Sequence, residues 1–346
     1  MTDLHLGLAG VGRIGVMHAE NIATTPGVAR LTLADVAVDR AREVAASLTA
    51  AARAAGSELQ VDVAASSEAL LASGIDGLVV ATGTAQHPEL IVAGVDAGIP
   101  VLCEKPVAPD VALSLPVLEH IAANAGVVRI GHQRRYDAGY LAAKRAYDAG
   151  ELGWLHALRA TTCDMAPPPV AFLATSGGLF RDCSVHDFDV IRWITGREIV
   201  EVYARGSNNG DPAIGEVGDV DTALAVCTLD DGTLATVTAS RYNGAGHDVR
   251  LELQGSKASL MVGLDERTAL RSAEPGVTFP TGGPHLTFAE RFGAAYRAEI
   301  VAFTDLVRGV EGELCHPADA VAASRVADAA QESLLTGGPV RVDLPA

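Results

Sequence analysis

Short apolar runs alternate with longer amphipathic segments in the N-terminal part of the chain. The apolar runs cover residues 4–10, 30–34, 76–81 and 100–103. Runs this short and this continuously apolar are typical of parallel strands that are buried on both faces. The segments between them include predicted helices at residues 13–24, 39–55 and 89–97. This alternation predicts an α/β domain with a doubly wound parallel sheet over residues 1–125.

The pattern changes near residue 154, where apolar and polar residues begin to alternate one by one. Further strands of this kind are predicted at residues 222–228, 233–240, 249–254 and 258–262. The tripeptide Asp230-Asp231-Gly232 predicts a hairpin turn between two of them. Strands joined by short turns indicate a mostly antiparallel sheet, so residues 126–346 are predicted to form an α+β domain. Its C-terminal helices, at residues 288–308 and 317–335, are expected to pack back on the other elements.

Three glycines follow the first predicted strand as G-V-G-R-I-G: Gly10, Gly12 and Gly15. In a dinucleotide-binding turn the first glycine permits the tight turn, the second lets the backbone approach a pyrophosphate, and the third lets the helix pack closely. The second strand ends at Asp35, which is where such folds place the acid that binds the adenosine ribose. The alternative is a glycine-rich structural turn. Asp35 would repel the 2′-phosphate of NADP, so NAD is the predicted cofactor, and Arg40 is expected to face solvent.

Composition and charge narrow the classes of partner. The 346 residues are 49% hydrophobic, which is ample for two packed domains, and the net charge is −17 without a run of Lys or Arg. Nucleic acid would meet net repulsion, so a small molecule is the expected partner. The chain has neither a basic leader nor a stretch of about 18 apolar residues, so we expect no membrane segment and a cytoplasmic location. The five cysteines form no C-x-x-C pair, which predicts neither disulfides nor a metal site.

Lys105 is the first candidate for chemistry. It follows a predicted strand in the sequence Cys103-Glu104-Lys105-Pro106, so its side chain is expected to reach the crevice that holds the nicotinamide. Only three of the 26 basic residues are lysines. A lysine in a chain that otherwise uses arginine suggests a role for a compact ammonium group whose pKa can be tuned. The alternative is a surface lysine paired with Glu104.

Asp182 and His186 form the second candidate. They stand four residues apart at the start of a predicted helix that runs to residue 195, so a helical turn would place them on one face. The carboxylate could then orient the imidazole and raise its basicity. The alternative is a buried histidine with Asp182 as the helix N-cap. Asp187 and Asp189 are expected to cap the helix and face water.

These motifs resemble the Gfo/Idh/MocA oxidoreductases and, within that family, the inositol 2-dehydrogenases. The resemblance covers nearly the whole chain. Its marks are G-V-G-R-I-G-V-M-H from Gly10 and Asp35 at the end of the second strand, then E-K-P at Glu104, G-H-Q-R-R-Y-D from Gly131, and S-G-G-L-F-R-D-C-S-V-H-D-F-D from Ser176. The P-P-P that precedes the last motif is typical of the inositol subgroup.

The resemblance implies a Rossmann domain, a second domain with an open-faced sheet, and a homodimer or homotetramer formed through sheet faces. It also implies a catalytic triad of Lys105, Asp182 and His186. The expected cofactor contacts are Gly10, Gly12, Arg13, Ile14, Gly15, Asp35, Thr82, His87, Glu104 and Lys105. The expected substrate contacts are Arg135, Asp164, His186 and His247. The inositol enzymes tend to carry Y-G-Y-D-x-R where this chain has A-G-H-D-V-R at residues 245–250, so its polyol could differ.

The predicted function is therefore NAD-dependent oxidation of a secondary hydroxyl of a cyclic polyol, myo-inositol or a related sugar, to a ketone. No metal is required. Two alternatives stay open. One is a glycoside hydrolase on the same fold that oxidises its substrate transiently with bound NAD, and the other is a non-enzymatic sensor of NAD and a sugar. The triad argues against the sensor, which would have no need of it.

Overall fold

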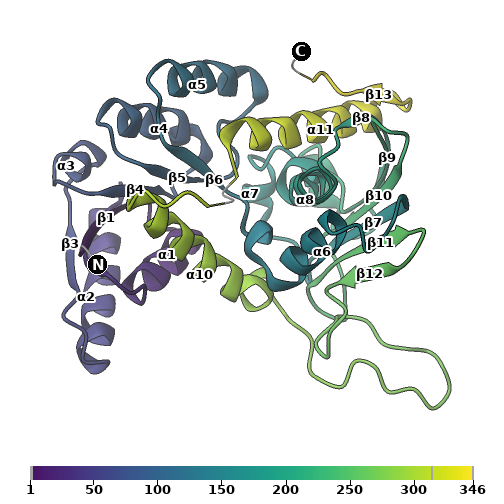
Figure 1. Cartoon of the computed structure of the whole chain (residues 1–346), viewed down its shortest axis with the longest axis horizontal. Coiled ribbons are helices and arrows are strands. Elements are labelled where there is room, and N and C mark those ends of the chain that lie inside the picture. Colours follow the sequence, from purple (N-terminus) through teal and green to yellow (C-terminus); the bar gives the residue numbers. More distant parts are fainter. Residues whose placement is uncertain (1–2, 313–314, 345–346) are drawn as a thin grey trace. The chain divides into compact units, whose positions relative to one another are not determined.

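The computed structural model describes residues 3–312 and 315–344 (Figure 1). The chain forms two compact units. The first comprises Met1–Gln133 and Ala294–Val321, and the second comprises Arg134–Gly293 and Ala322–Ala346. The first division thus falls between Gln133 and Arg134, whereas the sequence pattern placed it after residue 125.

The first unit contains a parallel sheet of six strands in the order β3-β2-β1-β4-β5-β6. The strands are β1 Leu4–Ala9, β2 Val28–Ala34, β3 Gln60–Val63, β4 Gly77–Val80, β5 Val101–Glu104 and β6 Val128–Gly131. Outside β3 and the start of β2, their apolar side chains are buried, as continuously apolar runs predict. The strand order reverses between β1 and β4. Ligands of such sheets bind where the order reverses, beyond the carboxyl ends of the strands.

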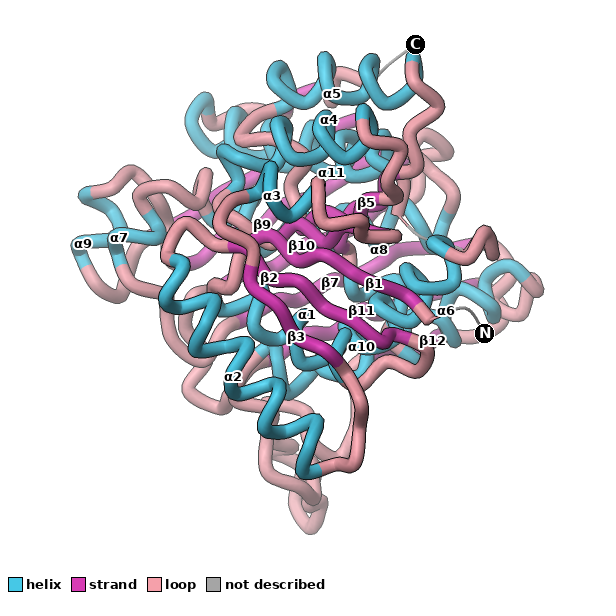
Figure 2. Tube along the Cα trace, turned by 90° about the vertical axis from the view of Figure 1, so that its left-hand side faces the viewer, coloured by secondary structure: helices cyan, strands magenta, loops and turns pink. Residues whose placement is uncertain are grey.

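Helices connect these strands. They are α1 Arg13–Ala23, α2 Val38–Ala54, α3 Ser67–Leu71, α4 His87–Asp96 and α5 Val111–Ala123, with a short 3₁₀ turn, η1, at Thr84–Gln86. Figure 2 shows α2 running alongside β2 and β3. From Ala294 onward the helix α10, Phe288–Val307, belongs to this unit. A Cβ on Gly77 would lie 2.7 Å from Val307, so glycine at this point of β4 lets the helix pack closely.

The second unit contains a mixed sheet of seven strands in the order β12-β11-β7-β10-β9-β8-β13. The strands are β7 Leu155–Cys163, β8 Ile199–Ser207, β9 Thr222–Leu229, β10 Leu234–Ser240, β11 Asp248–Gly255, β12 Ser259–Val262 and β13 Val340–Arg341. All pairs are antiparallel except β7 with β10. The predicted hairpin at Asp230-Asp231-Gly232 is confirmed, because Thr233 accepts a backbone hydrogen bond from Leu229 across the turn.

One face of this sheet is buried and the other is exposed. The remaining helices of the unit are α6 Ala138–Asp148, α7 Val170–Leu173, α8 Val185–Thr195, α9 Pro212–Glu216 and α11 Pro317–Thr336, with short turns η2 Gln133–Tyr136 and η3 Phe180–Ser184. Along β9 the small residues Ala223 and Ala225 point into the core, while Leu224 and Val226 are exposed. Among the described helices, none is long and apolar enough to cross a membrane.

Candidate active site

The turn after β1 has the geometry of a dinucleotide-binding turn. Gly10 has a φ of +92°, and a Cβ there would lie 2.5 Å from the Ala81 carbonyl oxygen, so glycine is required. A Cβ on Gly15 would collide with the carbonyl oxygen of Gly10. A Cβ on Gly12, by contrast, would meet nothing within 4 Å. Gly12 is the N-cap of α1 and offers no side-chain cap. The first amides of this helix are therefore open to an anion, which fits a pyrophosphate.

Asp35 is fixed beside this turn. Its Oδ2 accepts a hydrogen bond from the Val11 amide at 2.8 Å, and its Oδ1 accepts one from the Ala37 amide at 2.8 Å. A carboxylate has about four lone-pair sites, so two remain for ribose hydroxyls. Arg40 is exposed, but its Nε donates to the Val11 carbonyl oxygen at 2.8 Å. Arg40 thus faces solvent as expected, and in addition its side chain contacts the glycine turn.

His87 ties together the loops that follow β4 and β5. Its Nδ1 lies 2.7 Å from the Pro106 carbonyl oxygen, and its Nε2 lies 3.3 Å from the Thr82 carbonyl oxygen. The side chain is buried, with 1% exposure. A neutral imidazole has one N–H and can donate to only one of these carbonyls. The structure therefore gives His87 a role in holding the loop that carries Lys105, and its contact with the cofactor stays a prediction.

Glu104 ends β5 and lies in an acidic cluster within the first unit. Its Oε1 lies 2.7 Å from His18 Nε2. Burial acts to raise the pKa of Glu104, but the hydrogen bond from His18 and the positive charges of His18 and Lys105 outweigh it and lower that pKa. Glu299 of α10 brings a second carboxyl within 4.8 Å of Glu104 and His18. Glu299 is fully buried, and neither of its oxygens has a hydrogen-bond partner among the described residues.

Asp182 lies in the π-helical turn η3, immediately before α8. Such turns are frequent at functional sites. The N-cap of α8 is Ser184, so the alternative role of Asp182 as that N-cap is excluded. The Oδ2 of Asp182 accepts a hydrogen bond from Arg241 Nη1 at 2.7 Å. No sequence motif singles out Arg241. His186, which follows in the first turn of α8, is half-buried.

Two of the expected substrate contacts are neighbours. His247 Nδ1 lies 3.1 Å from Asp164 Oδ1, and the imidazole is buried. The Cys183 sulfur lies 3.9 Å from carboxylate oxygens of both Asp164 and Asp182. Asp182, expected to act in catalysis, and Asp164, expected to bind substrate, thus both lie beside Cys183.

Arg134 and Arg135 form ion pairs with the two buried aspartates of α8. Arg134 Nη1 donates to Asp187, whose Oδ2 also accepts from Thr162 at 2.8 Å. Arg135 holds Asp189 with two hydrogen bonds, of 3.0 and 2.6 Å. Both aspartates are fully buried, so the expectation that they cap the helix and face water is wrong.

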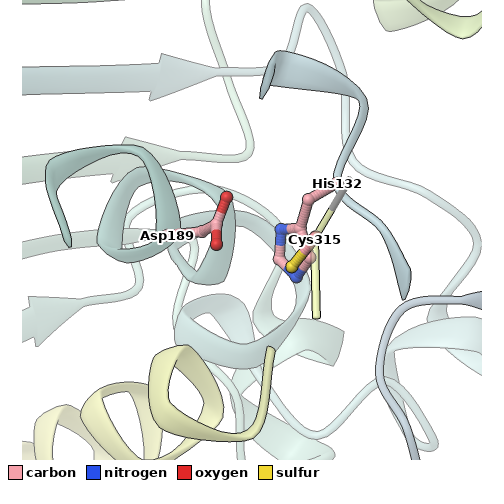
Figure 3. Close-up of side chains that lie close together, drawn as sticks. All are labelled: His132, Asp189 and Cys315. Carbon is pink, nitrogen blue, oxygen red and sulfur yellow. The ribbon is translucent and has the colours of Figure 1, made fainter. Parts of the chain in front are cut away.

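Among the side chains labelled in Figure 3, His132 and Cys315 are buried residues of the first unit. Asp189 belongs to the second unit, where Arg135 neutralises its charge. Arg135 is engaged by this carboxylate, and its expected contact with substrate stays a prediction.

Comparison with known proteins identifies the class. A model described as "Oxidoreductase family, NAD-binding Rossmann fold" matches residues 4–132, and one described as "GFO/IDH/MocA C-terminal domain" matches residues 140–261. The myo-inositol dehydrogenase Hyg17 of Streptomyces leeuwenhoekii is 38% identical over 307 residues, which cover 87% of this chain and 88% of that protein.

Solved structures agree. A myo-inositol dehydrogenase from Corynebacterium glutamicum matches with a TM-score of 0.87 and 34% identity over 100% of both chains. A scyllo-inositol dehydrogenase from Lactobacillus casei, solved with bound NAD(H) and scyllo-inositol, matches with a TM-score of 0.85 and 27% identity over 99% of both chains.

The parallel sheet, the glycine turn and Asp35 define a dehydrogenase-type Rossmann unit, and the protein is an NAD-dependent oxidoreductase acting on CH–OH donors. The chain belongs to the Gfo/Idh/MocA family. The predicted fold class and cofactor are thereby confirmed.

Proposed function

We propose that this enzyme oxidises one secondary hydroxyl of an inositol, or of a closely related cyclic polyol, to a ketone. The observation that carries the proposal is the resemblance over 87% of the chain to a myo-inositol dehydrogenase, combined with the cluster around Asp182 in the second unit. Polar side chains at this cluster offer both donors and acceptors. Such groups suit a ring that carries a hydroxyl on every carbon.

His186 is the proposed general base and takes the proton of the reacting hydroxyl. Bound NAD accepts the hydride from the same carbon, so the C–H and O–H bonds break as the C=O bond forms. Asp182 orients the imidazole and stabilises its positive charge. Lys105 donates a hydrogen bond to the reacting oxygen, which stabilises the charge that develops there. Lys105 belongs to the first unit, and Asp182 and His186 belong to the second.

The remaining site residues have proposed binding roles. Gly10, Gly12 and Gly15, with the amides of Arg13 and Ile14, hold the pyrophosphate, and Asp35 holds the ribose. Thr82, His87 and Glu104 shape the nicotinamide end. Arg135, Asp164 and His247 bind polyol hydroxyls, with the pair of Asp164 and His247 presenting one acceptor and one ring nitrogen. These binding roles complete the expected cofactor and substrate sets.

The test is a panel of inositols and sugars assayed with NAD, followed by reduction of the corresponding ketones with NADH. We expect NADH absorbance to rise with at least one inositol. A glycoside hydrolase that only borrows NAD would release sugar from a glycoside and accumulate no NADH. A sensor would bind both ligands without turnover.

The exposed face of the second sheet is the proposed oligomer interface, in a homodimer or homotetramer. Tyr203, Leu224, Val226 and Leu234 are each 40–55% exposed. Val226 lies beside Tyr203 in the register of the sheet and two residues from Leu224 on the same strand, so these three side chains adjoin one another on the exposed face. Monomeric proteins rarely expose such patches.

A cytoplasmic location is also proposed. All five cysteines are free thiols, and four of them are buried. Free thiols are stable in a reducing compartment. Fractionation of cells that produce the tagged full-length chain would test this, with recovery outside the cytoplasmic fraction as the contrary result.

A further inference from the structure

Arg241 follows β10 and has no exposed surface. Burying a guanidinium is costly unless carboxylates compensate its charge and its N–H groups find acceptors. Two carboxylates compensate the charge here and accept from both terminal nitrogens, while Nε has no acceptor among the described residues. Nη1 donates to Asp182 at 2.7 Å, and Nη2 donates to Asp219 at 2.9 Å. One planar fork therefore joins a residue of the proposed triad to an acid that the mechanism does not use.

Asp219 is held in place by the backbone. Its Oδ1 accepts backbone hydrogen bonds from Leu179 and Val220, both at 2.9 Å, and its Oδ2 faces Arg241. Leu179 directly precedes the π-helical turn that carries Asp182. The series from Asp219 through Arg241 to Asp182 is thus attached to the backbone at the start of that turn. A side chain held in this way keeps one rotamer, which a reactive site requires.

The charges do not cancel. Two carboxylates face one guanidinium, so one negative charge remains. The Asp219 side chain is 4% exposed and accepts hydrogen bonds from three donors, whereas the Asp182 side chain is 19% exposed. The excess negative charge is therefore best accommodated at Asp182, where an imidazolium can use it. The Cys183 sulfur lies 3.9 Å from carboxylate oxygens of both Asp182 and Asp164, and Asp164 in turn pairs with His247.

We propose that Arg241 is a positioning residue for the dehydrogenase reaction, which holds the Asp182 carboxylate in its orientation while Asp219 withdraws part of the guanidinium charge. The inference rests on the proposed function, because it matters only if Asp182 acts in the reaction. Arg241 has no exposed surface, so it acts on the reaction through Asp182. It sets the geometry and charge of the residue that supports the base.

Two variants separate this role from a purely structural one. Arg241→Lys keeps the charge but loses the fork, so kcat/KM for the inositol should fall at least about tenfold, while NAD binding, which uses the first unit, should be unchanged. Weaker pairing should also move the acid limb of the kcat/KM profile to higher pH, by up to about one unit. Asp219→Asn keeps an acceptor for the backbone amides but removes a negative charge. Arg241 then acts on Asp182 alone, so the acid limb should move to lower pH.

Arg192→Lys is the matched control. Arg192 is also almost buried and makes a fork to Glu198, with hydrogen bonds of 2.7 and 2.6 Å, at the other end of α8. This control should leave the activity and the pH profile of the parent unchanged. Melting curves of all three variants report on folding. If Arg241→Lys does not fold, the proposal is tested by the direction in which Asp219→Asn moves the acid limb of the kcat/KM profile.

Opposite shifts in the two variants support the proposal. Parent-like kcat/KM and pH profiles in both variants, with an active parent enzyme, overturn it and leave the proposed function standing. Shifts in the same direction would show a structural disturbance and would also overturn it. A parent that oxidises no polyol would overturn the proposed function, and the positioning role with it.

Discussion

The carboxylate of Asp35 accepts a hydrogen bond from the backbone N–H of Val11, at 2.8 Å. This bond joins the end of β2 to the glycine turn that follows β1, so the ribose site and the pyrophosphate site form one rigid unit. Arg40 adds a cation at the same place, through its hydrogen bond to the Val11 carbonyl oxygen. The two charges have opposite consequences for the choice between NAD and NADP.

We predict that Asp35→Ser narrows the preference for NAD over NADP. Two like charges about 4 Å apart repel by ~1 kcal/mol in water and by ~4 kcal/mol at an effective dielectric of 20, so the parent should discriminate by several-fold to about a thousandfold. The measurement is kcat/KM for each cofactor at saturating inositol. An unchanged ratio would show that Asp35 does not control the choice.

The same assay tests Arg40. In the Asp35→Ser background, Arg40→Gln should lower kcat/KM for NADP again. The reason is that the guanidinium, which is hydrogen-bonded to the Val11 carbonyl oxygen, is expected to bind the 2′-phosphate. Arg42→Gln is the control, since Arg42 is exposed and pairs with Asp39 in the same helix. Equal effects of the two changes would assign the gain to general surface charge.

His186→Ala should abolish hydride transfer and leave NAD binding intact. The imidazole is the proposed base, and it lies in the second unit, whereas the cofactor-binding turn lies in the first. Activity is followed by NADH absorbance and NAD affinity by calorimetry. Turnover within a few-fold of the parent would mean that another group takes the proton.

Lys105→Arg should also be severely impaired, although the charge is kept. A planar guanidinium cannot replace a compact ammonium that donates to a single oxygen in a packed site. The loss should appear in kcat more than in KM, because the interaction strengthens as charge develops on the oxygen. Near-normal kcat would return Lys105 to the role of a surface lysine beside Glu104.

Val226→Asp should reduce the oligomer to a smaller species. It places a charge in the middle of the exposed apolar patch, beside Tyr203. Light scattering after size exclusion gives the mass. Val277→Asp is the matched control, because Val277 is 52% exposed in a loop outside the sheet. If Val226→Asp keeps the parent's mass, the sheet face is not the interface.

The site residues that could be predicted from the sequence lie close to one another along the chain. The residue that could not be predicted lies far along the chain from its partners. Gly10, Gly12, Gly15 and Asp35 fall within one strand-helix-strand segment, where local spacing reports the geometry. Arg241 stands 59 residues from Asp182 and 22 from Asp219. No periodic pattern links residues at such separations, so nothing in the sequence marks Arg241 as a partner of the triad.

The aspartates of α8 show the same limit. An acid near a helix start usually caps the helix or faces water, and this rule misplaced Asp187 and Asp189. Their arginine partners stand 53 and 54 residues earlier. The motif G-H-Q-R-R-Y-D contained both arginines, but pairing two arginines with two buried acids requires the tertiary structure.

Strand β8 was not predicted from the sequence, because its second half, with Tyr203, Arg205 and Ser207, lacks a buried apolar pattern.

Glu299 poses a further problem that sequence could not show, because a glutamate inside a long helix is ordinarily exposed. Here the side chain is fully buried, and burial, with the charge of Glu104 nearby, raises the pKa of Glu299 well above its ordinary value of 4.5. The folded protein therefore keeps a proton on Glu299 at a pH where the unfolded chain has released it. Stability from this group is fully present below about pH 4.5 and is lost as the pH rises toward the folded-state pKa.

We therefore predict that Glu299→Gln, which mimics the protonated acid, becomes increasingly stable relative to the parent as the pH rises. The difference in unfolding free energy should grow by up to about 1.4 kcal/mol per pH unit until the folded-state pKa is reached. Denaturant titrations between roughly pH 5 and pH 8 would measure it. Glu89→Gln, an exposed change in α4, should show no such slope. A constant difference between Glu299→Gln and the parent across this range would mean that Glu299 is ionised in the folded protein, with its charge compensated by His18 or Lys105.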